Sequence, residues 1–277
     1  ELSFFDLEPN ALSSINVQQL VILQLKSCGI VNSPENQAAL CAMNQLQTLE
    51  LRGNPLGSFF NLNLLPALKH LDLSDTGLGE LPPGITDNPH LATALFSENN
   101  LTELPDALFD LPAERSDGID LADNPQLSLA TRERIKTYYR RTGQDFDVLA
   151  DPTDITLARE LFPSLDTVEA SEVIYDLPGT LADARVQLYT WKTELEGLKR
   201  DLRAWALQVP QHDPVTGAAI DAIEMYNNYT ARSEFSQQLQ RFWRSRSTTS
   251  SMREDHFVAN LAFSGDMPRL SADFSHV

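Results

Sequence analysis

Leucines recur in a fixed order through the first half of the chain. The order L-x-x-L-x-L-x-x-N/C-x-L begins at residues 20, 46, 68, 91 and 116, so the starts lie 26, 22, 23 and 25 residues apart. The repeat that begins at Leu91 replaces two of the leucines by Ala94 and Phe96, and the last one has a weakened start and one extra residue. The alternating L-x-L part predicts a short strand whose leucines all point to one side.

A small polar residue follows each strand and predicts a buried ladder of hydrogen bonds. The turn at this point leaves backbone N–H and C=O groups facing the interior, and an Asn side chain can satisfy both kinds. The residues at this position are Cys28, Asn54, Thr76, Asn99 and Asn124. A period of 20–29 residues with this order is typical of leucine-rich repeats. We therefore predict an α/β fold, namely a leucine-rich-repeat solenoid with a parallel sheet on its concave side.

The segments that connect one strand to the next, called returns here, are predicted to be of two kinds. Residues 78–83 and 101–105 share an L-x-x-L-P pattern, which favours an extended chain because proline restricts the backbone. Residues 33–45 predict a helix, with Ser33 as N-cap and Pro34 at its first position.

Residues 128–141 predict an amphipathic helix that covers the open end of the array. We expect its inner face to consist of Leu129, Ile135 and either Tyr138 or Tyr139. We expect its solvent face to consist of Arg132, Arg134, Lys136 and Arg140.

After residue 142 the repeats stop. Residues 142–163 are acidic and read as irregular, and residues 166–177 predict a helix with a capping box formed by Asp166 and Glu169. Residues 180–209 predict a long helix with apolar residues at heptad spacing. The heptad positions are Leu181, Leu188, Leu195, Leu202 and Val209, and Ala184, Trp191, Leu198 and Trp205.

Two tryptophans at heptad positions are too bulky for a tight dimer seam. They favour a hairpin with a second helix at residues 217–245, and a coiled-coil dimer is the alternative. Residues 260–270 echo the repeat pattern again. We therefore predict three parts: residues 1–142 as the repeats with their capping helix, 143–250 as a helical insertion, and 251–277 as the start of a further repeat block. Both ends of the chain suggest that it is part of a longer protein.

The charge of the chain narrows the choice of partner. The formal net charge is −18, with an isoelectric point near 4.5. Phosphate backbones and anionic membrane surfaces require the opposite sign, so we expect no nucleic acid and no membrane partner. No run approaches the roughly 20 apolar residues of a membrane span, so membrane insertion is not expected either. The complementary partner is a protein with a basic surface.

The residues between the inward leucines predict a binding face on the concave sheet. Six of its charged residues are acidic and two are basic, and Leu95 is an apolar residue at a projecting position. The candidate binding residues are Lys26, Glu50, Arg52, His70, Asp72, Asp75, Leu95, Glu98, Asp120 and Asp123. The alternative interpretation is the solvated face of an acidic protein.

Signals for catalysis are absent from the sequence. It contains no phosphate-binding glycine loop and no nucleophile elbow, and its five histidines have no metal-ligand spacing. Acidic pairs recur at equivalent repeat positions, so they belong to the array. We predict no catalytic residue, no metal and no cofactor. The two cysteines, Cys28 and Cys41, predict two buried reduced thiols, and a bridge between them is the alternative.

The repeats with their L-P returns, the segment LPGTLADARVQLYTWKTELEGLKRDLRAWA, the later QRFWR and the ending LSADFSHV resemble large bacterial effector- or toxin-like leucine-rich-repeat proteins. Many members of that class end in a novel-type E3 ubiquitin ligase domain, whose nucleophile is a Cys in a Cys-x-Asp setting. Cys28 and Cys41 stand in no such setting, so any ligase domain would lie outside these residues.

The resemblance implies a protein-recognition module of a larger effector. A fragment of an E3 ubiquitin ligase and a structural spacer are the alternatives. The localisation stays open between the bacterial cytoplasm and secretion or translocation into a host cell.

Overall fold

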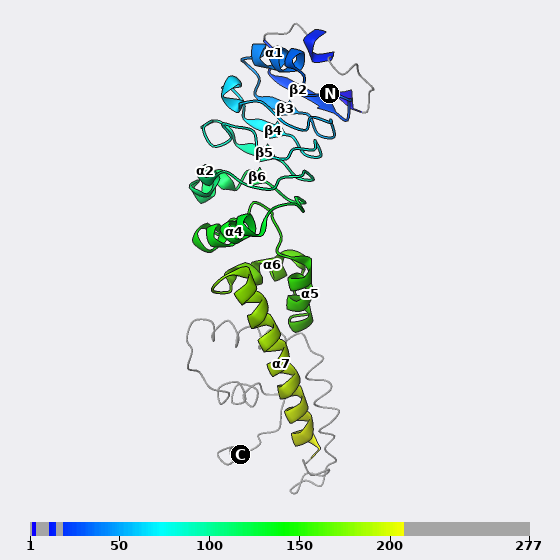
Figure 1. The fold of residues 1–277 in the computed structure, drawn as a ribbon, viewed down its shortest axis with the longest axis vertical. Helices are drawn as coiled ribbons and strands as arrows, with labels where there is room; N and C mark the ends of the chain where they lie inside the picture. Colours follow the sequence, from blue (N-terminus) through cyan, green and yellow to red (C-terminus); the bar gives the residue numbers. More distant parts are fainter. Residues whose placement is uncertain (1, 4–10, 15–18, 208–277) are drawn as a thin grey trace, which may run out of the picture. The chain divides into compact units, whose positions relative to one another are not determined.

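The computed structural model describes residues 2–3, 11–14 and 19–207 (Figure 1). The chain divides into two compact units, residues 1–150 and residues 151–277. Each unit is described by itself.

The first unit is built on a parallel sheet in which each strand pairs with the strands before and after it in the sequence (Figure 1). The strand order is therefore the chain order, which confirms the predicted α/β class with a parallel sheet. The strands are β1 (Leu2–Ser3), β2 (Ile22–Lys26), β3 (Thr48–Glu50), β4 (His70–Asp72), β5 (Thr93–Leu95) and β6 (Ile119–Asp120). Leu23, Leu49, Leu71, Ala94 and Ile119 stand opposite one another in register, and all five are buried.

The returns between the strands are more helical than the sequence pattern predicts. Helix α1 (Pro34–Ala42) forms as expected, and the Ser33 side chain accepts a hydrogen bond from the Asn36 N–H. The return after Leu104 was expected to be extended but holds two helical turns, α2 (Asp106–Phe109) and α3 (Ala113–Ser116). Pro105 and Pro112 stand at their N-cap positions, where a missing N–H costs nothing. Two 3-10 turns, η1 (Ala11–Ser14) and η2 (Leu62–Leu64), complete the returns.

Helix α4 (Leu129–Thr142) follows the last strand, and its buried face differs from the predicted one. Ile135 and Tyr138 are buried as expected. Leu129, expected to face the repeats, is 67% exposed, and Lys136, expected to face water, is 1% exposed. The inner face includes Thr131, and Leu129 lies two residues earlier, about 200° round the helix from it.

The first unit continues to Ala150, eight residues beyond the predicted boundary at residue 142. The Leu121 N–H donates to the Phe146 carbonyl at 2.9 Å, which extends the strand pairing past β6. The Phe146 ring is buried and stacks on Tyr138 with centroids 4.9 Å apart. Residues 143–150 therefore complete the core of the repeats.

The second unit contains α5 (Pro152–Leu161), α6 (Thr167–Asp176) and α7 (Leu181–Ala206). Helix α5 lies in a segment predicted to be irregular. Its local signals are nevertheless clear, because the Asp151 side chain accepts from the Thr153 N–H and Pro152 occupies the first turn. The capping box of Asp166 and Glu169 at the start of α6 is confirmed.

The heptad face of α7 packs on α5 and α6 within the described residues. Ala184, Leu188, Trp191 and Leu195 are buried, and Trp191 meets Phe162 edge to face at 6.3 Å. The expected partner of this face was a helix at residues 217–245, but the structure shows that α5 and α6 cover this part of it.

Several predictions lie outside the described residues. They concern the side chains of Leu198, Leu202 and Trp205, the helix at 217–245 and the repeat block at 251–277. Among the described helices, none is long and apolar enough to cross a membrane.

Candidate functional site

The turn after each strand is fixed by the asparagine ladder. The Asn54 Oδ1 atom accepts from the N–H groups of Cys28 and Ile30 at 3.0 and 2.9 Å, and its Nδ2 donates to the Leu25 and Leu51 carbonyls. Asn99 does the same between the next repeats: its Oδ1 accepts from the Thr76 and Leu78 N–H groups, and its Nδ2 donates to the Leu73 and Phe96 carbonyls. Asn124 accepts from the Leu101 N–H and donates to the Phe96 and Leu121 carbonyls. Thr76 and Cys28 each donate to one backbone carbonyl, at 2.6 and 3.3 Å.

The residue just before each ladder position has a left-handed backbone. Its φ angle lies between 52° and 72° in all five repeats, and the residues are Ser27, Gly53, Asp75, Glu98 and Asp123. Three of the predicted binding acids, Asp75, Glu98 and Asp123, therefore stand in this turn, beyond the carboxyl ends of the strands. The carboxylates of all three are exposed.

The outward side chains of the strands form three rows across the sheet. Strand register aligns Ile22, Thr48, His70 and Thr93 in one row, and Gln24, Glu50, Asp72, Leu95 and Asp120 in the next. The third row lies two residues further along the chain from each second-row residue, and it holds Lys26, Arg52, Ser74, Ser97 and Ala122. Ser74 stands at an outward position of this row, yet it is 1% exposed and accepts a hydrogen bond from the Ser97 hydroxyl at 3.1 Å.

Both predicted basic residues of this face are engaged by acids of the same face. The Lys26 ammonium lies 2.8 Å from Glu50, and the Arg52 guanidinium lies 2.5 Å from Glu98. Partial burial acts to raise the pKa of Glu50, but hydrogen bonds from Lys26 and Gln24 outweigh it and leave that pKa below its ordinary value. The positive charges are therefore already neutralised.

Four predicted acids of the face take part in no ion pair of the described residues: Asp72, Asp75, Asp120 and Asp123. They gather toward the end of the sheet at β6. Burial raises the pKa of nearby Asp147, and the negative charges of Asp120 and Asp117 raise it further. Asp120 thus adds negative charge beside Asp147 at this end of the array.

Apolar side chains also reach this face. Leu95 is half-buried in the second row, between Asp72 and Asp120. Ile22 in the first row is 56% exposed, and the sequence analysis missed it. Its signal was a branched apolar residue at an outward strand position, one residue before an inward leucine. His70 stands in the same row as Ile22, two strands away, and its Nδ1 atom lies 3.3 Å from the Thr93 hydroxyl.

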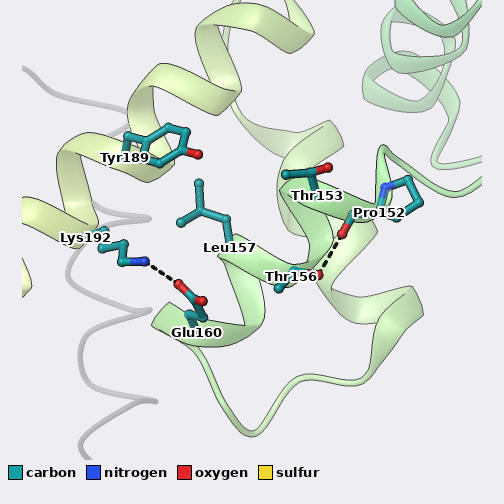
Figure 2. A pocket seen from close by; sticks show the side chains of 7 residues that line it. All are labelled: Pro152, Thr153, Thr156, Leu157, Glu160, Tyr189 and Lys192. Carbon is teal, nitrogen blue, oxygen red and sulfur yellow. Dashed lines mark hydrogen bonds and ion pairs between the residues drawn. The ribbon is translucent and has the colours of Figure 1, made fainter.

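The second unit carries a pocket of about 380 Å³ between α5 and α7, shown in Figure 2. Its lining residues are Pro152, Thr153, Thr156, Leu157, Glu160, Tyr189 and Lys192. Lys192 and Glu160 form an ion pair at 2.5 Å on its border, and the hydrogen bond that the Lys192 ammonium donates to Glu160 raises the pKa of Lys192. A raised pKa favours the charged form of this ammonium, which opposes a role as base or nucleophile.

Neither cysteine has the setting of a catalytic thiol. Cys28 is buried in the ladder, and burial raises the pKa of Cys41, which opposes the thiolate form. In the part of the chain that the structure describes, no three His, Cys, Asp or Glu side chains are grouped as metal ligands.

Comparison with known proteins agrees with the repeat geometry. The Leucine Rich Repeat family model matches residues 67–88, which contain β4 and its ladder turn. A curated protein, the Protein flightless-1 homolog of Caenorhabditis elegans, is 32% identical over 108 residues. The match covers 37% of this chain and 8% of that protein, so the chain spans only a small part of its relative. The chain thus contains a leucine-rich repeat at residues 67–88, and the strands before and after it share the same register and ladder geometry.

Proposed function

We propose that the first unit is a leucine-rich-repeat solenoid that binds another protein through the outward face of its sheet, and that this partner has a basic surface. The observation that carries the proposal is the charge arrangement of the face: Lys26 and Arg52 are neutralised by Glu50 and Glu98, whereas Asp72 and Asp120 form no ion pair with any residue that the structure describes. Unpaired charges of one sign on a rigid surface steer a complementary partner into contact.

Binding, rather than catalysis, is the role we propose for this chain. A fragment of a ubiquitin ligase would need an activated cysteine in another segment. Cys28 is buried in the ladder, and burial raises the pKa of the Cys41 thiol, so neither is an activated nucleophile. The parentage in a bacterial effector-type protein is a proposal that rests on the sequence resemblance of the repeats with their L-x-x-L-P returns and of the later segments. A purified chain that transferred ubiquitin by itself would contradict the proposal.

The experiment first identifies a partner by capture on the intact chain, and this partner is then produced as a purified protein. Its association rate is measured against salt concentration for the native chain and for Asp72→Lys with Asp120→Lys. We expect the double reversal to slow association by about tenfold or more at low salt, and to flatten the salt dependence.

The matched control reverses two exposed acids in the returns, Asp87→Lys with Asp110→Lys, so that the net charge is the same. We expect this variant to keep most of the native rate. Equal rates and equal salt dependence for both double variants would show that the sheet face is not the binding surface.

A further inference from the structure

Three residues in the middle row of the sheet form a linear pattern of acid, apolar residue and acid. Strand register places Asp72 opposite Leu95, and Leu95 opposite Asp120. Neighbouring strands lie about 4.8 Å apart, so the two aspartates stand roughly 10 Å apart with the leucine midway between them. The line runs across the strands, along the direction in which the repeats stack.

The two aspartates are held in place by the backbone. Asp72 accepts a hydrogen bond from the Ser74 N–H at 3.0 Å, and Asp120 accepts one from the Ala122 N–H at 2.8 Å. Each bond orients its carboxylate before any partner arrives, which lowers the entropy cost of binding. No ion pair of the described residues uses either group.

The spacing of this line discriminates between partner conformations. In an α-helix, residues i and i+7 lie on one face about 10.5 Å apart, and residue i+4 lies between them. In an extended strand, residues on one face lie about 6.8 Å or 13.6 Å apart, and neither distance matches roughly 10 Å. A helix lying across β4, β5 and β6 therefore brings two basic residues to the aspartates and one apolar residue to Leu95.

We propose that the partner presents an α-helix to this face, with basic residues at positions i and i+7 and an apolar residue at i+3 or i+4. This inference rests on the proposed function, because it concerns the same face and specifies the chemistry of the partner. The charges give the register and the association rate, and the contact with Leu95 supplies the apolar burial that charges alone lack.

The test uses the whole chain and three synthetic peptides of the same length and charge. The first has a helix-forming background with lysines at i and i+7 and a leucine at i+4. The second has the same composition, with the lysines and the leucine moved to different helical faces. The third contains prolines that keep it extended, with lysines flanking the leucine at alternate positions. Fluorescence anisotropy gives the Kd of each peptide.

We expect the first peptide to bind about tenfold more tightly than the other two at low salt. The double variant Asp72→Asn with Asp120→Asn should remove this preference. Asparagine is similar in shape and still accepts the backbone hydrogen bonds, so the turns are retained. The control Asp87→Asn with Asp110→Asn makes the same charge change in the returns and should keep the preference.

Two results would overturn the inference. One is equal affinity for the three peptides, and the other is a preference for the first peptide that survives Asp72→Asn with Asp120→Asn. The proposed binding face is tested separately, since it fails if the association rate of the captured partner is unchanged by Asp72→Lys with Asp120→Lys. A partner that responds to that reversal, together with three equally bound peptides, would reject the helix and retain the binding face.

Discussion

Single side chains decide whether the repeats can close their turns. Asn99 is 3% exposed, and its amide satisfies backbone groups of two successive repeats at once. Its neighbour Asn100 is exposed and makes a hydrogen bond with Gln126 at 3.3 Å. The same residue type thus has a structural role at one position and a surface role at the next.

Asn99→Leu should lower the free energy of unfolding by about 1–3 kcal/mol, which is the cost of leaving a buried backbone group without a hydrogen bond. Several groups lose their partner here, so the upper part of this range is expected. Asn100→Leu, the matched control, should change the free energy of unfolding by no more than about 0.5 kcal/mol. Urea denaturation of both variants provides the comparison. A similar loss in both would show that the ladder does not stabilise the array.

The secondary-structure elements show which predictions the sequence permits. The strands and the ladder could be predicted from the sequence, because the same pattern of leucines and small polar residues recurs in every repeat. Each further match at the same spacing strengthens the prediction. The capping box at the start of α6 could also be predicted, because Asp166 and Glu169 are three residues apart and form it locally. Helix α5 carries a comparable local signal, with Asp151 as N-cap and Pro152 in its first turn, but the prediction of an irregular segment followed the acidic composition instead.

Other failures concern contacts that no local pattern encodes. The inner face of α4 depends on how the helix is rotated against the last repeat, and this rotation decides that Lys136 is buried and Leu129 is exposed. In the candidate site, the sequence supplied the rows of outward residues. It could not show that Lys26 and Arg52 are neutralised by Glu50 and Glu98, because these pairs join different repeats.

The packing of α7 on α5 and α6 can be tested on a single helix. Trp191→Ala should destabilise the second unit by about 3–5 kcal/mol, because a 3% exposed indole leaves a cavity beside Phe162. Tyr189→Ala removes an aromatic ring that is 52% exposed on the same helix and should cost much less. Calorimetry resolves the unfolding of the two units, and only the transition of the second unit should shift in Trp191→Ala. Equal effects of the two substitutions would contradict the observed packing.

The division of the chain into two units implies that the repeats carry their own core. The unit needs a closing element at its open end, because the last repeat would otherwise expose apolar residues. That element includes α4 and also residues 143–150, since Phe146 stacks on Tyr138 and its carbonyl accepts from the Leu121 N–H. The two possible boundaries, after Thr142 and after Ala150, therefore differ in stability.

A fragment of residues 1–150 should unfold at the temperature of the first unit in the whole chain. It should also bind the helical peptide with the same Kd within about twofold, because the face from β2 to β6 is unchanged. A fragment of residues 1–142 loses the Phe146 ring and the last strand pairing. It should be less stable by about 3–5 kcal/mol, the usual cost of deleting a buried aromatic side chain. Thermal unfolding followed by circular dichroism measures both fragments side by side. Equal midpoints would mean that residues 143–150 do not belong to the core of the repeats, and that the unit ends at α4.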